Sequence, residues 1–109
     1  MPGETVVVSD ASFEKDVLQS SEPVLVDFFA DWCQPCKAMA PALEQVASEM
    51  KGKVKIAKLD VDANPGVTQK YHIQAMPTLM IFKDGKKVAE RVGALVQKKQ
   101  LADWINGSI

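Results

Sequence analysis

The sequence contains few soft metal ligands and has no excess of basic residues. It has one histidine, two cysteines and a formal net charge of -1, from 13 basic and 14 acidic side chains. A closed zinc site takes four ligands, whereas Cys33, Cys36 and His72 supply three soft ones, so we expect no metal. His72 adjoins no acid or nucleophile and is expected at the surface, at a helix end. Interspersed charges of both signs argue against nucleic acid or an anionic membrane surface as the partner.

Long apolar runs are also missing from this chain of 109 residues. No stretch approaches the roughly 20 apolar residues that span a bilayer, and residues 1–5 lack the basic and apolar regions of a signal peptide. We therefore expect a cytoplasmic protein, although a mature secreted chain would also lack its signal. In the cytoplasm, where thiols are kept reduced, a lone cysteine pair is more often catalytic than structural.

The apolar pattern predicts one α/β domain over residues 1–109. This length and an apolar content of 47% suffice for a single core. Alternating strand and helix signals, with an Asp84-Gly85 hairpin turn, predict a mixed sheet with helices on both faces, parallel strands first and an antiparallel hairpin last. Strands are expected at 6–8, 24–30, 54–61, 78–82 and 87–92, and helices around 13–18, 33–50, 64–71 and 101–105, the last ended by Gly107.

The two cysteines, Cys33 and Cys36, lie three residues apart, directly after the apolar run 24–30. Residues i and i+3 in the first turn of a helix bring their Cβ atoms to roughly 5–6 Å. A disulfide needs Cα atoms about 4.4–6.8 Å apart. The spacing therefore predicts a site that switches between dithiol and disulfide with little backbone movement, which is a redox signature.

The start of a helix is expected to activate one cysteine more than the other. Unpaired backbone N–H groups and the positive end of the helix dipole favour an anion there. Cys33 should accordingly be exposed and nucleophilic, while Cys36, one turn further in, should be more buried and resolve the mixed disulfide. Pro35 suits the first turn because its missing N–H has no partner there anyway. The alternative is a static disulfide or two inert buried thiols.

Two charged residues stand out within apolar strand patterns. Asp27 lies in the run 24–30, where burial should raise its pKa enough for proton exchange near neutral pH. We predict that it takes the proton of Cys36, directly or through a water; the alternative is an edge aspartate that caps a loop. Lys58 shares strand parity with apolar neighbours, and Asp27 on an adjacent strand is its candidate partner. The alternative for Lys58 is an edge lysine whose stem alone is covered.

Taken together, these residues resemble the thioredoxin family over nearly the whole chain. The family usually has Gly where Gln34 stands, Trp where Phe29 stands and Gly-Ile where Ala75-Met76 stand, so the chain is a Cys-Gln-Pro-Cys variant. The matching segments are Val24-Leu25-Val26-Asp27-Phe28, Trp32-Cys33-Gln34-Pro35-Cys36-Lys37, Ala40-Pro41, Ala57-Lys58-Leu59-Asp60-Val61-Asp62, Asn64-Pro65, Pro77-Thr78-Leu79 and Val92-Gly93-Ala94-Leu95.

The resemblance implies the thioredoxin fold, a central mixed five-stranded sheet flanked by about four helices. It also implies a thiol–disulfide oxidoreductase that reduces protein disulfides by dithiol/disulfide exchange. It supports Cys33 as nucleophile, Cys36 as resolving thiol and Asp27 as proton acceptor beside Lys58, and it implies that Pro77 is cis. The residues expected to bind substrate are Trp32, Gln34, Pro35, Met76, Gly93 and Ala94, with Pro77 in the same apolar rim.

The resemblance further implies the partners. They are disulfide-containing protein substrates and an NADPH-dependent thioredoxin reductase, a flavoprotein that recharges the chain. The chain itself would be a monomer that binds no cofactor and carries only the redox-active disulfide Cys33–Cys36. Two rival functions stay open: an oxidant or isomerase whose potential is raised by Gln34 and its neighbours, and a thioredoxin-fold module that only binds partners through its rim.

Overall fold

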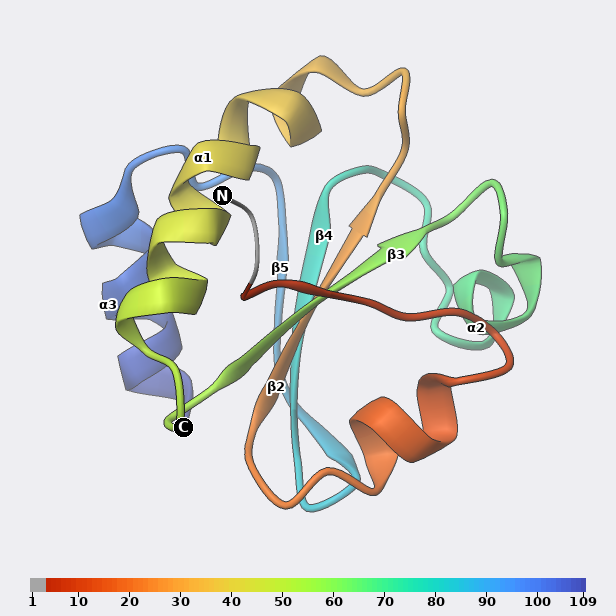
Figure 1. Cartoon of the computed structure of the whole chain (residues 1–109). Helices are drawn as coiled ribbons and strands as arrows, with labels where there is room; N and C mark the ends of the chain where they lie inside the picture. Colours follow the sequence, from red (N-terminus) through yellow and green to blue (C-terminus); the bar gives the residue numbers. More distant parts are fainter. Residues whose placement is uncertain (1–3) are drawn as a thin grey trace.

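The computed structural model describes residues 4–109 and contains five strands and four helices in the predicted order (Figure 1). Residues 1–3, part of the segment expected to lack signal-peptide features, lie outside the described residues. The elements are β1 (Val6–Val7), η1 (Glu14–Leu18), β2 (Val24–Phe29), α1 (Gln34–Glu49), β3 (Lys55–Asp60), α2 (Pro65–Lys70), β4 (Thr78–Lys83), β5 (Lys86–Val92) and α3 (Lys98–Ser108).

The sheet has the strand order β1-β3-β2-β4-β5. β1, β3 and β2 run parallel, whereas β4 is antiparallel to β2 and β5 is antiparallel to β4. The prediction of parallel strands followed by an antiparallel hairpin is therefore confirmed. Asp84 and Gly85, with φ of 54° and 81°, form the hairpin turn, which requires two positive φ angles in succession.

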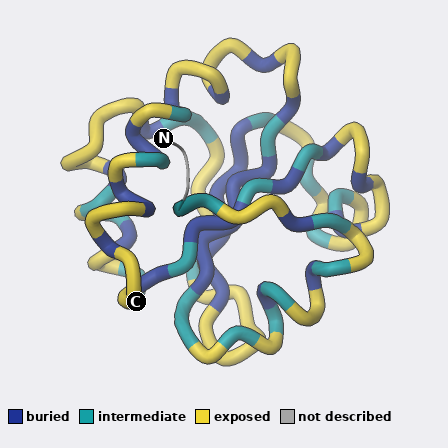
Figure 2. The backbone as a smooth tube through the Cα atoms, viewed as in Figure 1, coloured by how far each residue is buried: buried dark blue, intermediate teal, exposed yellow. Residues whose placement is uncertain are grey.

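Helices cover both faces of the sheet: α1 and α3 lie on one face, η1 and α2 on the other (Figure 1). The central strand β2 is buried along nearly its whole length, and buried residues follow the middle of the sheet in Figure 2. Val26 of β2 packs in the cluster that includes residues of η1 and α2, and Leu25 packs with α1 and α3. Because strand side chains alternate, Asp27 shares the face of Leu25 and is directed toward α1.

Two local predictions need correction. The first helix is a short π-helix, η1, rather than an ordinary α-helix. The last helix does not end at Gly107 but continues through it to Ser108. Gly107 keeps a negative φ, and backbone hydrogen bonding extends to Ile109, whose N–H donates to the carbonyl of Ile105 at 3.2 Å. Within residues 4–109, no helix is both long and apolar enough to cross a bilayer.

Candidate active site

The cysteine pair lies where β2 leads into α1. Cys33 is the N-cap residue of α1, in an extended conformation, and its Sγ accepts a hydrogen bond from the Cys36 N–H at 3.2 Å. The two residues form a disulfide with their Cα atoms 5.3 Å apart, so the predicted dithiol/disulfide geometry is confirmed. Pro35 occupies the first turn, where no intrahelical partner is lost. The backbone thus presents a donor to the sulfur of Cys33 before any substrate arrives.

The expected difference in cysteine exposure is wrong for this disulfide form. Cys33 is 4% exposed and Cys36 is 6% exposed, so both residues are buried to the same degree. The side chain of Cys33 turns back over the helix start, where it accepts the backbone hydrogen bond and bonds to Cys36. The asymmetry between the two sulfurs therefore lies in helix capping, since Cys33 is the N-cap and Cys36 lies within the first turn.

Asp27 is a buried carboxylate in the central strand. It is 1% exposed, and within the described residues its Oδ1 has no hydrogen-bond partner. Burial raises the pKa of Asp27 from 3.8 to about 7, against the opposing effect of the Lys58 charge. The alternative of an edge aspartate that caps a loop is excluded, because β2 is flanked by β3 and β4. A carboxyl with this pKa gains and loses a proton near neutral pH.

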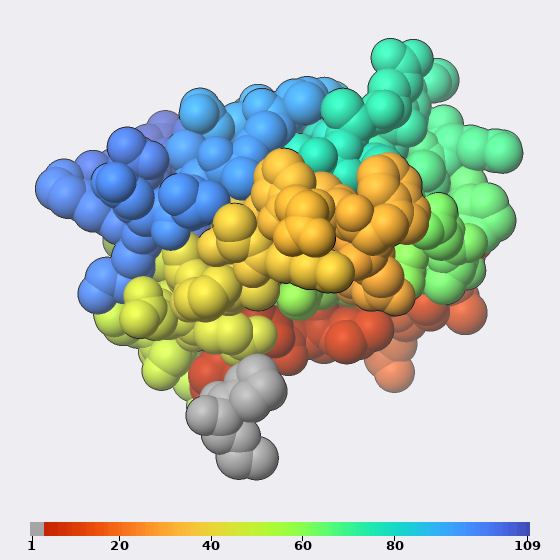
Figure 3. All heavy atoms as spheres, turned by 90° about the horizontal axis from the view of Figure 1, so that it is seen from above, coloured from red at the N-terminus to blue at the C-terminus, as the bar shows by residue number. Residues whose placement is uncertain are grey.

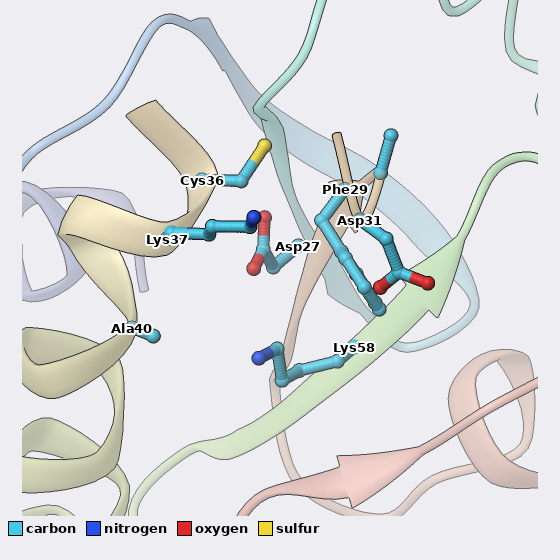
Figure 4. A pocket seen from close by; sticks show the side chains of 8 residues that line it. Asp27, Phe29, Asp31, Cys36, Lys37, Ala40 and Lys58 are labelled. Carbon is cyan, nitrogen blue, oxygen red and sulfur yellow. The ribbon is translucent and has the colours of Figure 1, made fainter. Parts of the chain in front are cut away.

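A cavity of about 150 Å³ is lined by both Asp27 and Cys36. Figure 4 shows the Asp27 carboxylate and the Lys58 side chain directed into the space between β3 and α1. The volume exceeds what one water molecule needs, and polar groups line it, so water can enter and link Asp27 to Cys36. The lining residues are Asp27, Phe29, Ala30, Asp31, Cys36, Lys37, Ala40 and Lys58.

Lys58 is the neighbour of Asp27 but not its ion-pair partner. The two residues lie on adjacent strands, as predicted, and they are register partners in the parallel β2–β3 pair. The ion pairs of residues 4–109 involve other side chains, and the Lys58 Nζ lies 5.0 Å from the centroid of the Phe29 ring. The expected pairing is therefore corrected: Lys58 acts on Asp27 through the field of its charge, while its ammonium group contacts an aromatic face.

The second half of the site is a rim on the β4 side of the cysteines. The Met76–Pro77 peptide bond is cis, as the resemblance implied, and the Gly93 N–H donates to the Pro77 carbonyl at 2.9 Å. Gly93 has a φ of 105°, which L side chains rarely adopt. In Figure 3 the orange segment that carries the cysteines lies beside the cyan start of β4 and the blue segment after β5.

Trp32 is the most exposed large side chain of this rim. It is 65% exposed, and its Nε1–H donates to Asp62 Oδ2 at 2.9 Å. The remaining expected substrate-binding residues surround the cysteines: Gln34 and Pro35 are exposed, whereas Met76, Gly93 and Ala94 are half-buried.

Sequence reasoning missed five residues that line the cavity: Phe29, Ala30, Asp31, Lys37 and Ala40. Parity would have located Phe29, which follows Asp27 by two residues and so shares its side of the strand. Helical spacing would have located Ala40, which is four residues after Cys36 and one turn along α1. His72, in contrast, is exposed at the end of α2, as predicted. No cluster of three or more potential metal ligands occurs in the region from residue 4 to 109.

A mixed sheet of this order, with a helix-capping Cys-x-x-Cys pair, a cis proline beside it and a buried aspartate behind it, defines a thiol–disulfide oxidoreductase of the thioredoxin fold. The thioredoxin family model matches residues 4–107. The chain belongs to the thioredoxin family.

Curated relatives match this chain over nearly their full length. The chain is 51% identical to a thioredoxin of Pseudomonas aeruginosa over 104 residues, covering 95% of each chain. It is 49% identical to a thioredoxin of Rickettsia felis over 102 residues, covering 94% of this chain and 96% of the relative. A Rhodospirillum rubrum thioredoxin is 50% identical over 102 residues, covering 94% of this chain and 97% of the relative. The protein is thus a protein-disulfide oxidoreductase that works by dithiol/disulfide exchange, and the family implies disulfide substrates and a reductase in general.

Proposed function

We propose that the chain is a reductant in which Cys33 is the attacking thiolate and Cys36 the resolving thiol. The observation that carries this assignment is the hydrogen bond from the Cys36 N–H to the Sγ of Cys33 at the N-cap of α1. In the dithiol form this donor and the helix dipole stabilise a negative charge on Cys33 more than on Cys36. A thiolate, not a thiol, attacks a disulfide sulfur.

The reaction then proceeds in two exchanges. The Cys33 thiolate bonds to one sulfur of the substrate disulfide, the substrate S–S bond breaks, and the other substrate sulfur leaves as a thiolate that takes up a proton. Cys36 next loses its proton to Asp27 and attacks the Sγ of Cys33, which releases the second substrate thiolate. Two electrons have passed to the substrate, and the Cys33–Cys36 disulfide remains to be reduced again.

Asp27 suits the role of proton acceptor because it shares a cavity with Cys36 and its pKa is about 7. Lys58 tunes this carboxyl by its charge. On the other side of the cysteines, an extended substrate segment would bind beside cis-Pro77. The side chains proposed to contact it are Trp32, Gln34, Pro35, Met76, Gly93 and Ala94.

The wider setting forms part of the same proposal. We infer that residues 1–109 act as one domain, supported by a family match over residues 4–107, and that it works as a cytoplasmic monomer. It uses no bound cofactor or metal beyond its own disulfide. Its substrates are proteins with accessible disulfides, and an NADPH-dependent thioredoxin reductase returns it to the dithiol form.

The assignment of roles is tested by trapping. In Cys36→Ser the second exchange is lost, so the mixed disulfide between Cys33 and substrate proteins should accumulate and be visible on non-reducing gels. Cys33→Ser is the matched control and should trap nothing. If Cys36→Ser traps no protein although its Cys33 still reacts with a thiol reagent, the assignment of roles is wrong.

A further inference from the structure

The cavity behind the cysteines holds more charge than the reaction scheme uses. Asp31 enters from the loop after β2, Lys37 from α1 and Lys58 from β3, all around the buried carboxyl of Asp27. From β4, the residue that faces Asp27 is the apolar Leu79. The Cys33–Cys36 disulfide does not titrate. Lys58 is the charged register partner of Asp27, and its charge lowers the pKa of that carboxyl against the effect of burial.

The Lys58 side chain is directed toward the Phe29 ring rather than into an ion pair with Asp27. An ammonium in register with a buried carboxylate can form an ion pair, which gives the carboxylate a hydrogen bond but costs both groups their hydration. In this structure Asp27 Oδ1 stays without a partner in the described part of the chain. The ammonium of Lys58 lies instead over the ring of Phe29, 5.0 Å from its centroid.

Phe29 is well placed to hold that ammonium. It is the last residue of β2, two positions after Asp27, and it lines the same cavity. Its ring is half-buried, so its face is only partly available to water and attracts a cation more strongly than an exposed ring does. Lysine has many rotamers, and a lysine without this contact would spend most of its time in solvent at the cavity mouth.

We propose that Phe29 is a positioning residue for the redox reaction: its ring holds the Lys58 ammonium at a fixed place beside Asp27 without letting the two form an ion pair. The charge of Lys58 then favours the carboxylate form of Asp27, yet Oδ1 stays free to accept a proton. Ion pairing would occupy that oxygen, and a lysine free in solvent would act on it weakly. This inference rests on the proposed role of Asp27 as proton acceptor.

The test is a double-mutant cycle of Phe29 and Lys58 in which the measured quantity is the pKa of Asp27. The pKa of Asp27 is measured from its carboxyl carbon by NMR in the full-length oxidised protein. Lys58→Met should raise this pKa in the otherwise unchanged chain. In a Phe29→Leu background, where the aromatic face is gone, the same Lys58→Met change should raise the pKa by less than about half as much, because the two residues are coupled.

Phe29→Tyr is the matched control, since it keeps the aromatic face, and in that background the full effect of Lys58→Met should return. Loss of packing alone would shift the pKa of Asp27 in Phe29→Leu but would leave the effect of Lys58→Met unchanged. An effect of Lys58→Met in the Phe29→Leu background that equals or exceeds its effect in the wild-type background would therefore overturn the proposal. Failure of the underlying proton role would show separately, as an Asp27→Asn variant that reduces disulfides at an unchanged rate.

Discussion

The two sides of the cysteine pair differ in almost every physical property. On the β3 side lies a cavity that contains a buried carboxyl and an ammonium group and opens to solvent beside the exposed Asp31 and Lys37. On the β4 side lies an open rim with an exposed indole and a cis proline. The cavity and the rim meet at the start of α1. One turn of helix therefore separates the site of proton transfer from the surface that binds the protein substrate.

This separation has a chemical advantage. A carboxyl can have a pKa of about 7 only where it is shielded from water, whereas a protein substrate needs a surface that is accessible from outside. Because β2 is the central strand, it can present Asp27 toward β3 and α1 while its C-terminal end delivers the cysteines to the rim. Changes on one side should therefore alter proton transfer, and changes on the other should alter substrate affinity.

The largest expected effect is on the cavity side. Asp27→Asn should raise the stability of the protein and lower its activity. A pKa raised from 3.8 to about 7 means that the folded state holds its proton where the unfolded state releases it. The stability that the protonated carboxyl contributes is thus complete below pH 3.8 and is lost as the pH rises to about 7, at a cost of about 4 kcal/mol. Asn carries no charge, so Asp27→Asn should be more stable than the unchanged chain by about 2–4 kcal/mol at pH 8, with no such gain near pH 3.

Urea unfolding of the oxidised protein at both pH values measures this gain. Asp84→Asn, an exposed position in the hairpin turn that does not line the cavity, is the control and should show no such gain. Disulfide reduction by Asp27→Asn should meanwhile slow about 100-fold above pH 7, the lower end of the range for a general base. If the stability of Asp27→Asn and its rate of disulfide reduction both fall, the substitution has damaged the fold. The proposed difference between the two sides would then be wrong.

On the rim side, Trp32→Ala should weaken docking without affecting the proton. It removes an exposed apolar surface and the hydrogen bond to Asp62, a loss of about 1 kcal/mol. The KM for a protein disulfide should rise about fivefold, while kcat and its pH profile stay as they are. Val88→Ala is the matched control, because Val88 is an exposed apolar residue of β5 near the hairpin end, away from the cysteines. A changed pH profile in Trp32→Ala, with KM unaltered, would show that the two sides are not independent.

Strand parity and turn chemistry were enough to predict several features of the fold and the site. Strand parity placed Lys58 on an apolar face with Asp27 on a neighbouring strand, and turn chemistry identified the Asp84-Gly85 turn. These features depend on periodicity and on single-residue φ preferences, both of which are local. The cysteine spacing and the helix start were likewise local, so the N-cap position of Cys33 was predictable.

The predictions that were wrong concern choices made between elements. Whether Lys58 pairs with Asp27 or contacts Phe29 depends on the side chains of two strands packed against α1, which no single segment encodes. The burial of Cys33 depends on its tertiary surroundings as well as on its place at the helix start, since its side chain accepts the Cys36 N–H and bonds to Cys36. The hydrogen bonds of η1 span five residues rather than the four of an α-helix, and apolar spacing over five residues does not distinguish the two.

The smallest expected effect tests whether Gln34 belongs to the rim alone. Gln34 is exposed at the first position of α1, and the described residues provide no hydrogen-bond partner for its side chain. Gln34→Gly should cost at most about 1 kcal/mol of helix stability, shared by the dithiol and disulfide forms. Its reduction potential should therefore move by less than about 20 mV, since about 30 mV corresponds to 1.4 kcal/mol for two electrons.

The measurement is equilibration with defined thiol buffers, read by the fluorescence of Trp32, with Trp104→Phe in both chains to remove the second indole. A potential near the roughly -270 mV of thioredoxin in both chains would make Gln34 a determinant of substrate choice and exclude the rival oxidant or isomerase. A parent value of roughly -180 to -120 mV that returns toward -270 mV in Gln34→Gly would instead mean that a rim residue controls the direction of electron flow, and the division between the two sides would fail at this position.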